Sequence, residues 1–166
     1  MRESIILGID PGTRITGYGA VKGSSHGLNA IDFGCIRPPA SLPTSERYLI
    51  LYESLEKLIE RLQPDAIAVE TQFVYKNVQS AMKLGIARGM VILAAAKKKL
   101  PLYEYAPKRA KQAVVGNGAA SKYQVQKMIQ MLLQLNSMPE PEDAADALAL
   151  AICHLHHSTS IGKLFL

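Results

Sequence analysis

A segment near the C-terminus constrains the fold most, because it predicts a helix that is apolar on nearly every side. Residues 142–157 read EDAADALALAICHLHH. A helix of this composition has to be covered by other elements over most of its surface. Asp143 and Asp146 are three residues apart and therefore project from adjacent positions on one helical face. Aspartates in a buried helix need partners or a function.

The elements that could cover this helix precede it in the chain. Three strands, expected at Ser4–Ile9, Thr16–Val21 and Leu28–Cys35, are joined by short turn-forming segments and predict an antiparallel meander. Helical and strand patterns then follow at 44–63 (helix), 65–70 (strand), 77–97 (helix), 102–105 (strand), 108–115 (helix), a segment with Val125 to Leu133 on one face (helix) and 140–157 (helix). The order predicts an α/β fold with a mixed five-stranded sheet and helices on both faces.

Length and composition favour one domain. The chain has 166 residues, and we expect residues 1–157 to form the domain and residues 158–166, which have no periodicity, to form a tail. No apolar run reaches the ~18 residues that cross a bilayer, and no signal-peptide pattern is present, so we expect no membrane partner and a cytoplasmic location. Cys35 and Cys153 lack disulfide or zinc-ligand spacing.

The charges favour a polyanionic partner. Lys and Arg number 19 against 14 acids, which leaves a net charge of +5. Bases cluster at 97–99 and 107–111, whereas several acids stand singly among apolar residues. This separation suits a nucleic acid that is held by bases and acted on by acids.

Four carboxylates form the candidate site. Asp10 and Glu70 each end an apolar strand, so they lie side by side if the first and fourth strands are neighbours. Each acid also has an ordinary interpretation: Asp10 can begin a turn with Pro11, Glu70 can be an exposed strand end, and Asp143 can favour the start of a helix. That interpretation is weakest for Asp146, which is flanked by alanines.

Four clustered carboxylates suit a pair of Mg²⁺ ions. Mg²⁺ prefers carboxylate oxygens and keeps several waters. Without cations the four groups would repel one another and raise some of their own pKa values. Two ions about 3.5–4 Å apart activate a water on one side of a phosphodiester and stabilise the leaving oxygen on the other. This set therefore favours hydrolytic cleavage of a nucleic-acid strand.

Long motifs in the chain resemble the RuvC family of bacterial Holliday-junction resolvases. The matching segments are GIDPGTRITGYG, IAVE, QFVYKN, SAMKLGIARG, KQAVVGNGAASK and DAADALALAICH, and they extend from about Ile5 to His157. The resemblance implies an RNase H-like fold and a homodimer that makes paired, symmetric, metal-dependent nicks in four-way DNA junctions during recombination and repair. It also implies RuvA and RuvB as partners, two Mg²⁺ ions per active site, and Mn²⁺ as a substitute.

The resemblance also assigns residues. Asp10, Glu70, Asp143 and Asp146 match the catalytic metal ligands. Phe73 matches an aromatic residue placed against a junction base, and stacking of this kind contributes about 1–3 kcal/mol. Further DNA-binding candidates are Lys111 and Lys122 near the scissile phosphate, and Lys76, Asn77 and Arg14 along the backbone.

Small residues recur every four positions at Ala81, Gly85 and Gly89. The ridge that they form has two interpretations. It could pack closely against the chain's own sheet, or it could admit the same helix of a second subunit, as the family's dimer implies.

Three other functions share part of this sequence pattern. An ATPase or sugar kinase of the actin and Hsp70 type shares the strand-Asp opening but needs two related domains, which 166 residues cannot supply. An RNase H-type enzyme that cuts RNA in hybrids would use the same carboxylates and would recognise 2′-hydroxyls. A junction-binding protein without catalysis would not need the full acidic set.

Overall fold

One mixed sheet of five strands forms the centre of the domain. The computed structural model describes the backbone of residues 3–71 and 77–164, and the side chains of these residues up to 158. The sheet has the order β3-β2-β1-β4-β5, with β1, β2 and β3 antiparallel and β4 and β5 parallel to β1. The strands are β1 (Ser4–Asp10), β2 (Thr16–Ser24), β3 (Gly27–Ile36), β4 (Ala66–Glu70) and β5 (Leu102–Tyr105). The predicted mixed five-stranded sheet is confirmed.

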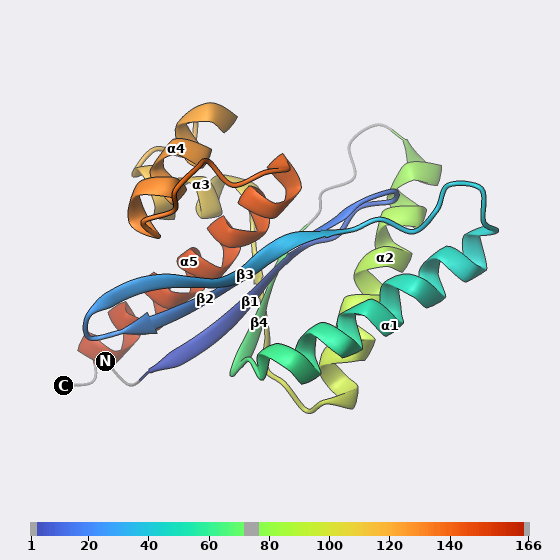
Figure 1. Ribbon diagram of the computed structural model, residues 1–166, viewed down its shortest axis with the longest axis horizontal. Helices are drawn as coiled ribbons and strands as arrows, with labels where there is room; N and C mark the ends of the chain where they lie inside the picture. The colour runs from blue at the N-terminus through green and yellow to red at the C-terminus, as the bar shows by residue number, and fades with distance from the viewer. Residues whose placement is uncertain (1–2, 72–76, 165–166) are drawn as a thin grey trace.

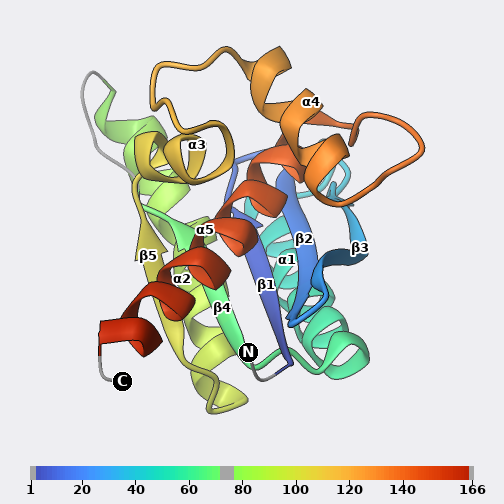
Figure 2. The same ribbon diagram turned by 90° about the vertical axis from the view of Figure 1, so that its left-hand side faces the viewer.

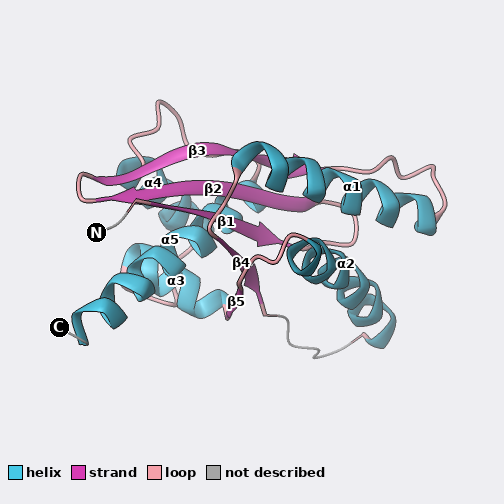
Figure 3. Cartoon of the chain, turned by 90° about the horizontal axis from the view of Figure 1, so that it is seen from below, coloured by secondary structure: helices cyan, strands magenta, loops and turns pink. Residues whose placement is uncertain are grey.

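Helices cover both faces of this sheet. They are α1 (Thr44–Leu62), α2 (Val78–Lys97), α3 (Pro107–Val115), α4 (Lys122–Leu132) and α5 (Glu142–Leu164). Helices α1 and α2 lie on one face, and α3, α4 and α5 lie on the other (Figures 1 and 3). Figure 2 shows α5 crossing the sheet over the central strands. This arrangement confirms the predicted layers.

Alternation along the strands divides the core into two parts. Ile9 and Val69 face α1 and α2, whereas Ile6 and Ala68 face α5. Because successive strand residues point to opposite faces, Asp10 and Glu70 belong to the α5 side. The central strands β1 and β4 are buried on both faces, which explains why they read as continuous apolar runs.

Helix α5 is covered as its composition predicts. Ala147, Leu148, Leu150 and Ile152 are completely buried, and each of the large side chains contributes about 1.5–3 kcal/mol to folding. His154 is also buried, and it shares a 2.7 Å hydrogen bond with the hydroxyl of Tyr105.

The end of this helix was predicted wrongly. Helix α5 continues through residues 158–164 to Leu164, so most of the expected tail is helical. The apolar period that marked the helix stops near His157. Helical hydrogen bonding does not need that period.

Helix α2 has an unusual surface. Within the described residues it is the one helix that is long and apolar enough to cross a membrane by length and composition, although no apolar run of that length was expected. Ala87, Val91 and Ala94 nevertheless bury one side of it in the domain, and Arg88 forms an ion pair with Glu104 of β5. Helix α2 is therefore part of the folded domain, and its other side is exposed.

Candidate active site

Asp10 and Glu70 occupy matching positions on neighbouring strands. β1 and β4 are parallel, and Ile9 pairs with Val69, so the residues that follow them end their strands at the same edge of the sheet. Both are partly buried and both lie on the α5 face. The first and fourth strands are thus neighbours, as was required for Asp10 and Glu70 to lie side by side.

Glycines bring the start of α5 against this edge. Gly17 pairs with Asp10 across β1 and β2, and a Cβ atom added at Gly17 would lie 2.0 Å from the carbonyl oxygen of Asp143. At Gly8, an added Cβ would lie 1.9 Å from the carbonyl oxygen of Ala147. Only glycine permits such an approach of helix to sheet. The start of α5, with Asp143 in its first turn and Asp146 three residues later, therefore lies directly over the end of β1.

The carboxylates affect one another electrostatically. Burial, with added repulsion from Glu70, Asp146 and Asp143, raises the pKa of Asp10 to about 8. Burial and the charge of Asp146 raise the pKa of Glu70 to about 7. The pKa of Asp146 is raised as well, mainly by burial. The four predicted residues therefore share one electrostatic environment in which negative charge is poorly compensated.

Two lysines supply part of the missing positive charge. The charge of Lys111 on α3 offsets part of the increase in the pKa values of Glu70 and Asp146. The charge of Lys122 on α4 does the same for Asp10 and Asp146. Lys122 also forms a 2.7 Å ion pair with Glu142, which helps to raise the pKa of the lysine. The two basic residues that the motifs selected thus lie beside the carboxylates.

The donor set fits hard divalent cations. Oxygen ligands and uncompensated negative charge are what Mg²⁺ selects, whereas its softer competitors prefer nitrogen and sulfur. Among the described residues, no three His, Cys, Asp or Glu side chains converge closely enough to hold one ion as they stand. The four carboxylates therefore share one electrostatic environment, but as they stand they do not form a complete set of ligands around one ion.

The structure describes only some of the remaining residues that were predicted to contact DNA. Phe73 and Lys76 lie outside the described residues. Arg14 is exposed in the turn between β1 and β2. Asn77 caps α2, where its side chain accepts a 3.1 Å hydrogen bond from the amide of Ser80, so a structural role for it is established.

Two neighbours of the site were missed by sequence reasoning. Cys35 on β3 lies near the start of α5, where burial and the charge of Asp143 raise the pKa of its thiol. Glu142 pairs with Lys122 as described above. Neither the position of Cys35 nor the pairing of Glu142 with Lys122 has a sequence signal, because β3 and α4 reach the site only through tertiary packing.

Comparison with known proteins supplies the family. Residues 6–154 match the family described as crossover junction endodeoxyribonuclease RuvC. The chain belongs to the RuvC family. A family protein from Protochlamydia amoebophila is 61% identical over 152 residues, which is 92% of this chain and 90% of the relative. One from Desulfitobacterium hafniense is 48% identical over 160 residues, covering 96% of this chain and 97% of the relative.

Solved structures agree with this membership. The structure of Thermus thermophilus RuvC in complex with Holliday junction substrate has a TM-score of 0.88 and 33% identity, and the match covers 93% of this chain and 94% of that one. The protein is therefore an endonuclease of the RuvC type, and its family is one of metal-dependent nucleases. The expected RNase H-like fold is confirmed.

The pKa shifts predict how stability depends on pH. Folding raises the pKa of Glu70, so its contribution to stability is complete below pH 4.5 and is lost as the pH rises through about 7. Without divalent cations, Glu70→Gln should stabilise the protein at pH 8.5 by on the order of 1 kcal/mol after allowance for solvent screening, and should have little effect near pH 4.5. Thermal unfolding in EDTA measures both values. Glu53→Gln, at an exposed position on α1, is the control, and equal pH slopes for Glu70→Gln and the wild type would contradict the assignment.

Proposed function

We propose that this protein resolves four-way DNA junctions by two symmetric, metal-dependent phosphodiester hydrolyses, during homologous recombination and DNA repair. The observation that carries this proposal is the meeting of Asp10, Glu70, Asp143 and Asp146 at one edge of the sheet, in a chain of the RuvC family. The Thermus thermophilus relative in complex with Holliday junction substrate supports the same substrate for this chain.

The four carboxylates would hold two Mg²⁺ ions in each active site, with Mn²⁺ as a substitute. When bound, the ions supply an activated water and stabilise the leaving oxygen. The carboxylates contribute the negative charge that positions the cations, and the raised pKa values of Asp10 and Glu70 indicate that the protein tolerates this charge poorly without a counterion. Lys111 and Lys122 would hold the scissile phosphate close to the carboxylates, because both already act on them electrostatically.

Other contacts would orient the junction. Phe73 would stack on a base, and Lys76 and Arg14 would contact backbone phosphates. The exposure of Arg14 in the turn that follows Asp10 supports this assignment. These residues would position DNA and take no part in bond breaking.

The exposed side of α2 would join two subunits. Among the described residues, no heavy atom beyond the neighbouring turns of α2 lies within 4 Å of a Cβ added at Gly85 or Gly89, so at these two positions the ridge does not pack against its own sheet. Val78 and Met82 are 71% and 65% exposed on the same helix, and Ile86 is 45% exposed. An apolar surface beside a small-residue ridge suits the same helix of a second copy, which would place two active sites in a two-fold dimer.

A charge on this surface should separate the subunits. Ile86→Glu should shift the protein from dimer to monomer in sedimentation velocity, because two glutamates would face each other across a two-fold axis. The monomer should no longer make coordinated nicks in both strands. Ile31→Glu on β3 is the matched control, since Ile31 is also 45% exposed. A dimer that survives Ile86→Glu would show that the interface lies elsewhere.

The cellular setting follows the family. We propose RuvA and RuvB, the branch-migration proteins, as partners, and the cytoplasm as location. Supporting this setting, the relatives match this chain over nearly their whole length.

Three substrates in parallel test the proposed function. With Mg²⁺ present, the protein should nick a synthetic four-way junction at symmetric positions and leave a linear duplex and an RNA–DNA hybrid intact. Product mapping on denaturing gels shows the positions. Cleavage of the hybrid would favour the RNase H-type alternative, and binding of the junction without cleavage in any divalent metal would favour a structural protein.

A further inference from the structure

A small cavity lies beside the β1–β2 turn, on the opposite side of that turn from the carboxylates. Its volume is about 50 Å³, and its lining comes from the turn, from α1 and from α2. A single water needs roughly 10–15 Å³ of such space, so the cavity has room for a group the size of one phosphate. The carboxylates face α5, whereas the cavity adjoins the α1 and α2 side.

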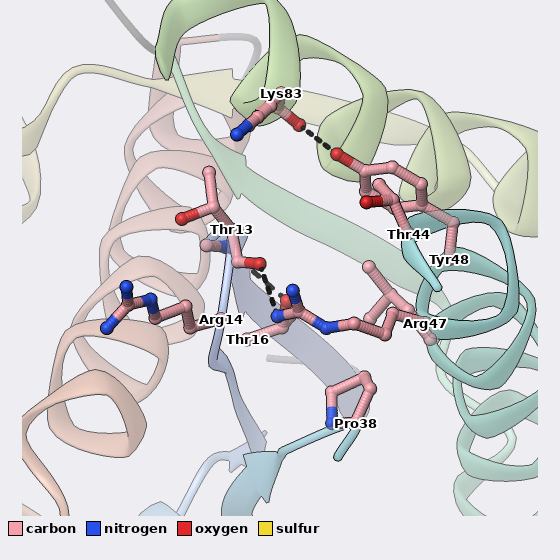
Figure 4. A pocket seen from close by; sticks show the side chains of 10 residues that line it. Thr13, Arg14, Thr16, Pro38, Thr44, Arg47, Tyr48 and Lys83 are labelled. Carbon is pink, nitrogen blue, oxygen red and sulfur yellow. Dashed lines mark hydrogen bonds between the residues drawn. The ribbon is translucent and has the colours of Figure 1, made fainter. Parts of the chain in front are cut away.

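The cavity is strongly basic. Arg14, Arg47 and Lys83 line it, and none of the described lining residues is Asp or Glu. No ion pair joins any of these three cations to another described residue. Figure 4 shows Arg47 reaching from α1 to the turn, with Lys83 above Thr13. Three uncompensated cations around one cavity make a site for an anion.

Arg47 has a buried donor that no partner satisfies. Its Nη2 atom donates a 3.0 Å hydrogen bond to the carbonyl oxygen of Thr13, but its Nε atom is buried and has no hydrogen-bond partner among the described residues. A buried charged donor left without a partner is destabilising. Hydrogen bonding within the described residues therefore satisfies Arg47, which lines the cavity, only in part.

The start of α1 adds positive potential. Thr44, the first residue of the helix, lines the cavity, and the N-cap residue Pro43 makes no side-chain capping bond. Amide groups in the first turn are therefore available to an acceptor. Glu46 is in the same turn and offsets part of the helix dipole, but it does not line the cavity. The helix end supports the cations and does not replace them.

The turn is tightly folded and follows Asp10 directly in the chain. The amide of Gly12 donates a 3.4 Å hydrogen bond to the hydroxyl of Thr16, and a Cβ added at Gly12 would lie 2.0 Å from the carbonyl oxygen of Ile15. A group bound in the cavity would thus have a set position relative to the catalytic edge.

We propose that this cavity binds one backbone phosphate of the junction DNA, held by Arg47 and Lys83 with Arg14, at a position other than the bond that is cut. The inference rests on the proposed function, because it needs DNA as the substrate. It adds Arg47 and Lys83 to the contacts that orient the junction. Its role is to fix the strand on the far side of the β1–β2 turn.

Salt-dependent binding gives the first test. Without divalent metal, Lys83→Gln should bind a four-way junction roughly 5- to 10-fold more weakly at 0.1 M salt and lower the salt slope by about 0.9, as expected for one lost phosphate contact. Lys83 is exposed, and only its backbone carbonyl serves Tyr48, so this variant should fold. Lys57→Gln, which removes an exposed cation from α1, should leave the slope unchanged. Equal slopes for both variants would overturn the proposal.

Neutral phosphates give the second test. One methylphosphonate is placed at each position of the junction strands in turn. At one non-scissile position, this substitution should weaken junction binding by the wild type but leave binding by Lys83→Gln unchanged. Absence of any such position, in a protein that still cuts junctions, would overturn this inference and leave the proposed function standing. If inorganic phosphate raises the Tm of the wild type but not of Lys83→Gln, and no position is coupled, the cavity takes a free anion and the DNA assignment is wrong. A wild type that neither binds nor cuts junctions would overturn both.

Discussion

Asp10→Asn should reduce junction cleavage by on the order of 10³-fold or more. The substitution removes a charged ligand from the carboxylate set, and a cation bound there supplies several kcal/mol of transition-state stabilisation. Binding of the junction without metal should be unchanged or slightly tighter, because one negative charge near the scissile phosphate is lost. Single-turnover cleavage and fluorescence anisotropy measure the two effects separately.

The control for this prediction lies at the other end of the sheet. Asp65 precedes β4, and its Oδ2 atom accepts a 2.8 Å hydrogen bond from the amide of Ile5. Asp65→Asn makes the same chemical change far from the site and keeps an oxygen acceptor, so its cleavage rate should match the wild type. Cleavage by Asp10→Asn at the wild-type rate would refute the catalytic assignment of Asp10.

Among the variants proposed for this protein, Gly17→Ala should lower the free energy of unfolding most. The added methyl group would lie 2.0 Å from the carbonyl oxygen and 2.4 Å from the carbonyl carbon of Asp143, and backbone atoms cannot rotate away as side-chain atoms can. The start of α5 must therefore move away from β2. We expect a loss of about 3 kcal/mol or more, measured as a lower urea midpoint. Cleavage should fall even where the variant is fully folded, because Asp143 moves away from Asp10.

Gly34→Ala separates this contact from a general effect of alanine in the sheet. Gly34 lies on the neighbouring strand β3, where an added Cβ meets the outer end of the Tyr18 ring, at 2.9 Å from its hydroxyl oxygen. That ring can shift, so we expect a smaller loss of about 1 kcal/mol and normal cleavage. Similar losses for both variants would show that α5 does not depend on the close contact at Gly17.

Much of the fold was predictable because the apolar patterns are strong. The meander of β1, β2 and β3, the alternation that follows it and the buried character of α5 all follow from periodicity and turn residues. The end of α5 was missed because the apolar period stops near His157, whereas the helical backbone continues to Leu164. The exposed side of α2 was open to two interpretations, because spacing alone does not show which surface a ridge meets.

The sequence by itself indicated most of the elements, the family and the four candidate carboxylates, because each of these resides in local patterns and long motifs. Only the tertiary structure decided that β1 and β4 are neighbours with Asp10 and Glu70 at matching positions, and that Gly17 admits the first turn of α5 over them. It alone gathered Arg14, Arg47 and Lys83 around one cavity. The physical reason is that charge and proximity act through space: residues far apart in the chain raise each other's pKa values, or form an anion site, only after packing brings them together.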